Sequence, residues 1–316
     1  MKKLILITTL VLMTVGAFGQ GDDFLELVKT GTSQEIQAAL DNGADVNSQN
    51  ENAETALMIA ATKDPHPDVT ATLLKAGADI DAQDMDGETA LTRAVVESRN
   101  PEVITTLLEA GANANSKDKD GKTALMWAAE KNLDPLVIIA LLNSGADLMV
   151  HDDDGRTPLI WAAENQNPLV ITTLLSSGAE LTVRDNDGRT ALTWAAEKNP
   201  NPAVITALLK AGENVNAHDD TGYTPLLWAA SGQNPAVITE LLKAGADINA
   251  RDEEGRTALM IAAKYNKDPE VIAVLLKAGA DARVKDNSGH TALDWSQGNA
   301  KLEGADVYQR LQAASR

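Results

Sequence analysis

The sequence has no cysteine among its 316 residues. Disulfides, thiolate catalysis and cysteine-based metal sites are therefore excluded. Aromatic residues are also scarce, at 3% of the chain, whereas hydrophobic residues reach 44% and are mostly Ala and Leu. A core of such small side chains is thin, which is typical of short helices that stack closely.

Basic residues are in deficit, because 27 Lys and Arg stand against 46 Asp and Glu and give a formal net charge of −19. An acidic chain repels phosphate backbones, so we do not expect nucleic acid as a partner. The same charge keeps an elongated protein soluble, which is the simpler reason for it.

Long apolar runs are missing except at the start. Leu4 to Val15 follows Lys2 and Lys3, and Ala17-Phe18-Gly19 places small residues before a cleavage point. This pattern predicts a signal peptide at residues 1–19, with an uncleaved anchor as the alternative. We therefore expect an exported bacterial protein, periplasmic or secreted, with no membrane insertion after leader cleavage.

Regularity is what the chain has in abundance. Two ladders of glycine recur every 33 or 34 residues and stay in register. The first ladder consists of Gly87, Gly121, Gly155, Gly188, Gly222, Gly255 and Gly289. The second consists of Gly43, Gly77, Gly111, Gly145, Gly178, Gly212, Gly245 and Gly279. Two ladders at one period predict a stack of near-identical units and not a domain with one central core.

A single unit, residues 185–218, shows the local signals. Asp185 to Gly188 is a turn sequence, since Asp and Asn bond their own backbone and Gly supplies a positive φ. Thr190 is the expected cap of a short first helix. Asn201-Pro202 begins a second helix, and Gly212 ends it. The apolar stripe of such a unit is buried only when neighbouring units stack.

The motifs Thr157-Pro158-Leu159 and Thr224-Pro225-Leu226, the recurring Leu-Leu pairs and Gly-Ala-Asp-Ile-Asn-Ala at 245–250 resemble the ankyrin repeat over roughly residues 22–311. The resemblance implies an all-α ankyrin-repeat solenoid of stacked helix-turn-helix units with protruding β-hairpin loops. The chain departs from the family where His usually follows Thr-Pro-Leu. It also has an Asn/Asp-Pro connection where Gly-His usually joins the two helices.

The repeats set the expected domain organisation. We expect one ankyrin-repeat domain over residues 20–316, with an N-terminal capping repeat at 22–49. Seven internal repeats are expected at 50–285 and a C-terminal capping repeat at 286–316. A monomer is expected.

In ankyrin-like arrays the first helices and hairpin tips line a concave face, and the resemblance implies that partners bind there. Trp127, Trp161, Trp194 and Trp228 occupy the same position in four successive repeats. With helices about 10 Å apart they would form a ladder about 30 Å long. The ladder is either a binding strip for an extended peptide or glycan, because Trp is enriched at hot spots, or a packing device in which the rings cover one another.

Basic and aromatic side chains follow the turn glycines of the hairpins. The members of this set considered for partner binding are Lys122, Arg156, Arg189, Tyr223 and Arg256. They form either a mixed-charge rim that selects a partner by register or a surface lattice of ion pairs of little value.

Catalytic and metal-binding signals are weak. His151, His218 and His290 fall in hairpins of different repeats and cannot converge on one site. Residues 151–155 superficially resemble a calcium loop, but Trp161 stands where the terminal Glu is needed. We therefore expect no enzyme activity, no cofactor and no metal.

The resulting hypothesis is a non-catalytic protein–protein interaction module that binds a protein partner on its concave face. One alternative is an envelope protein that binds a carbohydrate or small ligand through the tryptophan ladder. A second is a secreted, host-directed factor.

Overall fold

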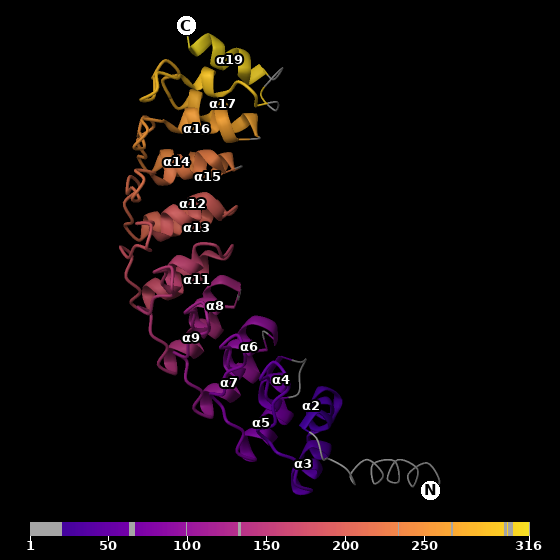
Figure 1. The fold of residues 1–316 in the computed structure, drawn as a ribbon. Coiled ribbons are helices and arrows are strands. Elements are labelled where there is room, and N and C mark those ends of the chain that lie inside the picture. The colour runs from indigo at the N-terminus through magenta and orange to yellow at the C-terminus, as the bar shows by residue number, and fades with distance from the viewer. Residues whose placement is uncertain are drawn as a thin grey trace, which may run out of the picture. The chain divides into compact units, whose positions relative to one another are not determined.

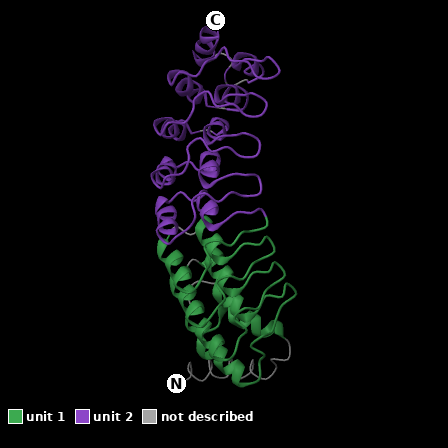
Figure 2. Ribbon diagram, turned by 90° about the vertical axis from the view of Figure 1, so that its left-hand side faces the viewer, with its two compact units in different colours: residues 1–153 green, residues 154–316 purple. Residues whose placement is uncertain are grey.

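The computed structural model describes residues 21–62, 67–98, 100–131, 134–232, 234–266, 268–299, 302 and 306–315. The predicted signal peptide at residues 1–19 lies outside this part of the chain. The chain divides into two compact units, residues 1–153 and 154–316 (Figure 2). The boundary falls inside a hairpin turn between Asp153 and Asp154, a position that no sequence signal indicated.

Unit 1 consists of short helices joined by loops (Figure 1). Its helices are α2 (Gly21–Thr30), α3 (Ser33–Asp41), α4 (Ala56–Thr62), α5 (Pro67–Lys75), α6 (Ala90–Arg93), the π-helical segment η1 (Ala94–Ser98), α7 (Pro101–Glu109), α8 (Ala124–Lys131) and α9 (Pro135–Asn143).

Unit 2 repeats the same plan. Its helices are α10 (Pro158–Ala162), α11 (Pro168–Ser176), α12 (Ala191–Lys198), α13 (Pro202–Lys210), α14 (Pro225–Ser231), α15 (Pro235–Lys243), α16 (Ala258–Tyr265), α17 (Pro269–Lys277), α18 (Ala292–Trp295) and α19 (Asp306–Ala314).

Within each unit the helices form two rows. In unit 2 the first helices α10, α12, α14, α16 and α18 contact one another in sequence, and the second helices α11, α13, α15, α17 and α19 do the same. Unit 1 has equivalent rows. The connecting loops project on one side of each unit (Figure 2). The prediction of stacked helix-turn-helix units is confirmed.

The helix starts follow the predicted capping residues. Asn201 precedes Pro202 at the start of α13, and its side chain accepts a hydrogen bond from the Ala203 N–H. Pro at this position loses nothing, because the first N–H groups of a helix have no intrahelical partner. Thr190 caps α12 by accepting from the Thr193 N–H at 3.4 Å. These caps fix where each helix begins.

The core is built from the apolar stripes of adjacent repeats. Val204, Ile205 and Leu208 of α13 are fully buried, as are Leu192 and Ala195 of α12. Small Ala side chains let the first helices approach one another closely, so a core with few aromatic residues can still be closely packed.

The loops between repeats have hairpin form without extended strands. The Asp185 N–H donates to the Arg189 carbonyl and the Gly188 N–H to the Asp185 carbonyl, both at 3.0 Å. Gly188 has φ 76°, which favours glycine. Among the described residues, only two isolated antiparallel bridges are present, Gln49–Thr55 and Arg251–Thr257. One backbone bond joins neighbouring loop tips, as from the Asp220 N–H to the Asp187 carbonyl at 3.1 Å.

The end helices bury apolar residues. Phe24, Leu25 and Val28 of α2 are buried in unit 1, and Val307 and Leu311 of α19 are buried in unit 2. Each end helix pair therefore covers an apolar surface of its inner neighbour while turning a polar face outward.

Candidate binding site on the first helices and hairpin loops

The indole N–H groups of Trp127, Trp194 and Trp228 each donate a hydrogen bond to the turn aspartate nine residues earlier. The Trp194 Nε1–H donates to Asp185 Oδ2 at 2.7 Å, and the Trp228 Nε1–H donates to Asp219 Oδ2 at 2.8 Å. The other carboxylate oxygen of Asp185 accepts from loop N–H groups. One aspartate thus fixes both the hairpin turn and the indole on the following helix.

Guanidinium groups lie between the indole rings of unit 2. Arg156 lies 3.7 Å from the ring centroid of Trp161 and 5.6 Å from that of Trp194. Arg189 lies 5.0 Å from Trp194 and 4.6 Å from Trp228. All four distances are within the range of cation–π attraction. The side chains alternate along the unit as ring, cation, ring, cation, ring.

Tyr223 and Arg256 continue this arrangement. The Tyr223 and Trp228 ring centroids are 4.9 Å apart. Arg256 lies 5.7 Å from the Tyr223 centroid and donates from Nη2 to the Tyr223 hydroxyl at 2.9 Å. Burial raises the pKa of Tyr223, so its hydroxyl stays protonated at neutral pH. We name the full set the Trp–Arg row: Trp161, Arg156, Trp194, Arg189, Trp228, Tyr223 and Arg256.

Acidic side chains at the loop tips and near the end of α12 hold the arginines of the row. Arg189 pairs with Asp187 at 3.4 Å and with Glu197 at 3.6 Å. Arg156 pairs with Asp154 at 2.7 Å. The tip carboxylates are the outermost groups: the Asp187 side chain is 70% exposed, whereas that of Arg189 is 21% exposed.

Unit 1 contains a smaller version of the same arrangement. The Lys122 ammonium lies 3.4 Å from the Trp127 ring centroid, and Lys131 lies 4.5 Å from it. Lys122 also pairs with Glu130 and is only 3% exposed. The Trp127 Nε1–H donates to Asp118 at 2.7 Å. Lys122 is therefore part of the packed interior of its repeat and not a surface charge.

These contacts sharpen the two interpretations of the tryptophan ladder. The rings of unit 2 neither stand bare nor cover one another, because an arginine from a hairpin lies between each neighbouring pair. Trp161 is 8% exposed, while Trp194 and Trp228 are half-buried. A role for these residues in partner binding stays a prediction.

The residues that anchor the row were not identified from the sequence. Asp185 and Asp219 stand nine positions before Trp194 and Trp228, and this fixed spacing was the available signal. The basic residues before the turn act differently from those after it: Arg184 donates to the His218 carbonyl at 2.7 Å, and Arg251 donates to the Lys285 carbonyl at 2.8 Å. They brace one loop against the next.

One buried acid stands outside this arrangement. Glu213 replaces the Ala found after the helix-ending glycine in other repeats, and it is 8% exposed. It accepts from the Leu192 N–H at 3.0 Å, in the first turn of α12. Burial raises the pKa of Glu213 to about 7, although this bond and one from Thr190 oppose the change. Its charge state therefore alters near neutral pH.

Other kinds of site are not present in the described part of the chain. No group of three or more His, Cys, Asp or Glu side chains there could hold a metal ion. None of the helices in that part is both long and apolar enough to cross a membrane.

Two rows of short helices joined by loops at a fixed period define a helical repeat protein. Family models described as ankyrin repeats (3 copies) match residues 25–118, 96–185 and 170–252, and a model described as ankyrin repeats (many copies) matches 241–295. The chain belongs to the ankyrin-repeat family. No curated protein matches it significantly. Ankyrin repeats are generally protein–protein interaction modules, and the family is typically non-catalytic.

Proposed function

We propose that this chain is a non-catalytic binding protein that docks a partner protein across the first helices and hairpin loops of unit 2. The observation that carries the proposal is the Trp–Arg row. Trp, Tyr and Arg are the residues most enriched at binding hot spots, and here seven of them form one continuous set of contacts.

The row is suited to binding because it is already ordered. Trp194 is held by Asp185 and by two guanidinium groups, and Arg189 is held by Asp187 and Glu197. Side chains fixed before binding lose little conformational entropy when a partner arrives. The contact area of the indoles is thus available at a low entropic cost.

The charge of the loop tips favours a partner with basic side chains. Asp154, Asp187 and Glu254 are the exposed outer members of their ion pairs, with the arginines held closer to the helices. A basic segment that approaches the loops meets these carboxylates first, which raises the association rate at low ionic strength. The net charge of −19 acts in the same direction.

Carbohydrate binding receives less support from the geometry. A sugar ring stacks on an indole face, and Trp194 and Trp228 each have a neighbouring guanidinium group over the ring.

We further propose that the protein acts after export, either in the envelope or as a secreted factor, on the strength of the signal-peptide pattern at residues 1–19.

The experiment that tests the proposal is affinity capture followed by calorimetry. Immobilised protein is used on envelope and secreted fractions, and the captured partner is then titrated against Arg189→Ala and a control, Leu169→Ala. Leu169 is 59% exposed on the second helix α11, so its truncation tests the opposite row at little cost to folding. We expect Arg189→Ala to weaken binding about 30-fold or more, corresponding to about 2 kcal/mol at a hot spot.

Two results would count against this placement. Equal affinity of the Arg189→Ala variant, with its fold confirmed by circular dichroism, would remove the row from the interface. A larger loss with Leu169→Ala would move the interface to the second helices. A shift of tryptophan fluorescence with oligosaccharides, and none with a protein partner, would favour the carbohydrate alternative.

A further inference from the structure

A series of asparagines marks the ends of the first helices in unit 2. Asn165, Asn199 and Asn266 are buried, and Asn299 is half-buried. The repeat period assigns one more residue to this series, between Asn199 and Asn266, and that residue is Gly232. The series is therefore interrupted once inside unit 2.

Three side-chain amides of the series, those of Asn199, Asn266 and Asn299, cap carbonyls of the preceding repeat. The Asn199 Nδ2 donates to the Ala163 carbonyl at 2.7 Å and to the Asn165 carbonyl at 2.8 Å. Asn266 does the same toward Ala230 and Gly232. Asn299 repeats the pattern, with both of its bonds at 3.0 Å. The fold thus contains a carbonyl pair that accepts a carboxamide at successive levels.

Gly232 has no side-chain carboxamide, so the Ala196 carbonyl of the preceding repeat lacks the donor that an Asn at this position would supply. The helical bond to the Ala196 carbonyl would come from residue 200, which is Pro200 and has no N–H. Among the described residues, no other donor forms a hydrogen bond with that carbonyl. In the equivalent place one repeat earlier, the Ala163 carbonyl receives the amide of Asn199.

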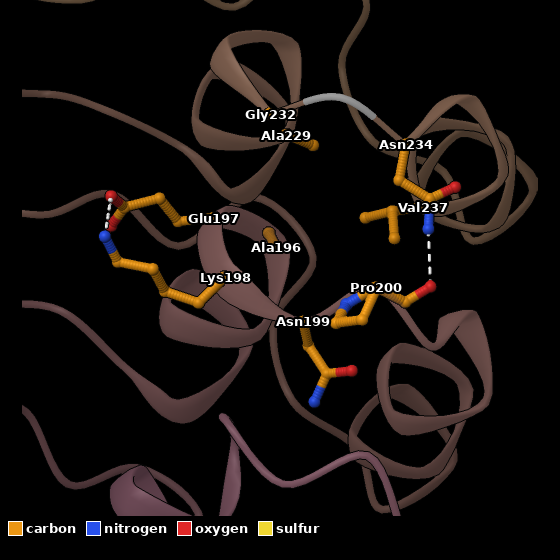
Figure 3. A pocket seen from close by; sticks show the side chains of 9 residues that line it. All are labelled: Ala196, Glu197, Lys198, Asn199, Pro200, Ala229, Gly232, Asn234 and Val237. Carbon is orange, nitrogen blue, oxygen red and sulfur yellow. Dashed lines mark hydrogen bonds and ion pairs between the residues drawn. The ribbon is translucent and has the colours of Figure 1, made fainter.

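A cavity of about 230 Å³ lies at this interruption (Figure 3). It is more than ten times the roughly 10–15 Å³ that one water molecule needs. The Asn199 side chain points away from it, toward the preceding repeat, while the Asn234 amide closes one side by donating to the Pro200 carbonyl at 2.5 Å. The Glu197–Lys198 ion pair stands on another side, with its charged atoms 2.9 Å apart.

The wall of the cavity near Gly232 carries hydrogen-bond acceptors. The atoms nearest to a Cβ built on Gly232 are the carbonyl oxygens of Ala229 at 3.3 Å, Glu197 at 3.5 Å and Ala196 at 3.8 Å. Backbone carbonyls accept hydrogen bonds and do not donate them, so a ligand that fits here must be a donor. A carboxylate ligand would instead meet these oxygens with no hydrogen to share.

We propose that the cavity at Gly232 is a binding site for a primary carboxamide, the side-chain group of Asn or Gln, supplied by another molecule. The same fold places this group on the same kind of carbonyl pair at Asn199, Asn266 and Asn299. The site lies at the ends of α12 and α14, beside the second helix α15, and contains no member of the Trp–Arg row. Glu197, which lines the cavity, also pairs with Arg189 of that row.

The sequence offers a selective spectroscopic probe of this site. Only five Ala residues are followed by Glu: Ala53, Ala129, Ala163, Ala179 and Ala196. Full-length protein labelled with ¹³C at Ala carbonyls and ¹⁵N at Glu amides therefore gives five carbonyl–amide NMR correlations. Ala196 reports on the cavity, and Ala163, already capped by Asn199, is the internal control.

Acetamide is the first probe. We expect it to shift the Ala196 correlation in a saturable manner, with the Ala163 correlation unchanged. Half-saturation should come at a concentration about tenfold lower than for acetate, which has no hydrogen to donate, as one lost hydrogen-bonded contact implies. Methylammonium donates hydrogen bonds but must give up the hydration of its charge, so it should also bind more weakly than acetamide. Free glutamine and N-acetyl-asparagine methylamide then distinguish an amino-acid source of the carboxamide from a protein source.

Two variants complete the test. Gly232 has φ −73° and ψ 171°, so other residues can adopt its backbone. Gly232→Asn should move the Ala196 correlation toward the position of Ala163 and abolish the response to acetamide, whereas Gly232→Ala should keep the response. Equal shifts of all five correlations, no saturable shift at Ala196, a stronger response to methylammonium, or an undiminished response in Gly232→Asn would each overturn the proposal.

Discussion

Two repeats of equal length, residues 84–117 in unit 1 and 185–218 in unit 2, solve one local problem with different side chains. Both turn aspartates need a donor for the outer carboxylate oxygen. Asp185 receives it from the Trp194 indole at 2.7 Å, whereas Asp84 receives it from the Arg93 guanidinium at 3.2 Å. In these two repeats the residue nine positions after the turn aspartate donates to it, whether or not that residue is aromatic.

The residue after the turn glycine changes together with that donor. Arg189 accompanies Trp194, while Glu88 accompanies Arg93. A guanidinium beside an indole is held by cation–π attraction, and a carboxylate beside Arg93 is held by charge, at 3.8 Å. Burial and the nearby Asp84 carboxylate raise the pKa of Glu88 even so. The two positions therefore form a coupled pair, and exchanging only one member should be unfavourable.

The largest effect is expected when the centre of the unit 1 arrangement is removed. Arg93 contacts Glu54, Asp84, Glu88 and Glu97, and its side chain is mostly buried. Arg93→Ala should lower the free energy of unfolding by about 3–4 kcal/mol, because it leaves several acids near one another without a cation. Urea unfolding followed by circular dichroism measures this. Arg93→Lys, which keeps the charge, should lose clearly less, and equal losses would show that the charge is unimportant.

A second difference between the two repeats is the buried acid of unit 2. Glu213 stands where the other repeat has Ala112. Because the pKa of Glu213 in the folded chain is about 7 and its ordinary value is 4.5, folded protein keeps a proton that unfolded protein loses. The contribution of Glu213 to the free energy of unfolding is fully present below about pH 4.5 and is lost as the pH rises through 7.

Replacement of Glu213 by Ala tests this directly. The difference in free energy of unfolding between the variant and the wild type should shift in favour of the variant by up to about 3 kcal/mol when the pH is raised from 4.5 to 8. The size follows because one pKa unit corresponds to about 1.4 kcal/mol. Denaturant unfolding of both proteins across this pH range measures the difference. Parallel stability curves for the two proteins would contradict the assignment of the pH dependence to Glu213.

The ends of the two first helices also differ. Asn199 ties its repeat to the preceding one through two amide bonds, whereas Ser98, at the matching position, accepts from the Asn100 N–H at 3.3 Å. Asn199→Ser should cost about 2 kcal/mol, because two buried carbonyls lose their donor. Hydrogen exchange should speed up locally in α10 and α12. The exposed Lys210→Ser serves as the control, and no loss beyond that control would refute the bridging role.

A smaller effect is expected from the indole bond itself. Trp194→Phe keeps an aromatic ring beside Arg156 and Arg189 but removes the hydrogen bond to Asp185. The loss should be about 1–2 kcal/mol, the range for a buried acceptor left without its donor. Thermal unfolding of the variant measures it. If Trp194→Leu is no worse than Trp194→Phe, the cation–π contacts contribute little.

The smallest expected quantity is the coupling between the two exchanged positions. Glu88→Arg and Arg93→Trp, made singly and together, give a double-mutant cycle that converts the unit 1 repeat to the unit 2 type. We expect the pair to be about 1 kcal/mol more stable than the sum of the single changes predicts. Additive losses would mean that the two repeats differ by chance.

Much of the fold could be predicted from the residues, and much of the site could not. Asn201-Pro202, Thr190 and Gly212 act within one or two helical turns, so their roles follow from local backbone chemistry. The identity of Trp194 and Arg189 was visible too, but not their interleaving. Arg156 and Trp194 are 38 positions apart, and no local rule says which cation lies on which ring.

The sequence by itself determined the repeat, its period, the capping of many of the helices and membership of the ankyrin family, because each of these depends on short-range bonds that recur at fixed spacing. Only the tertiary structure decided that arginines lie between the indoles of unit 2, that one aspartate holds both turn and ring, and that a missing asparagine leaves a cavity at Gly232. The physical reason is that the arginine contacts and the cavity arise between repeats, where stacking brings together side chains that the chain itself keeps far apart, while Asp185 meets Trp194 only when the loop folds against the following helix.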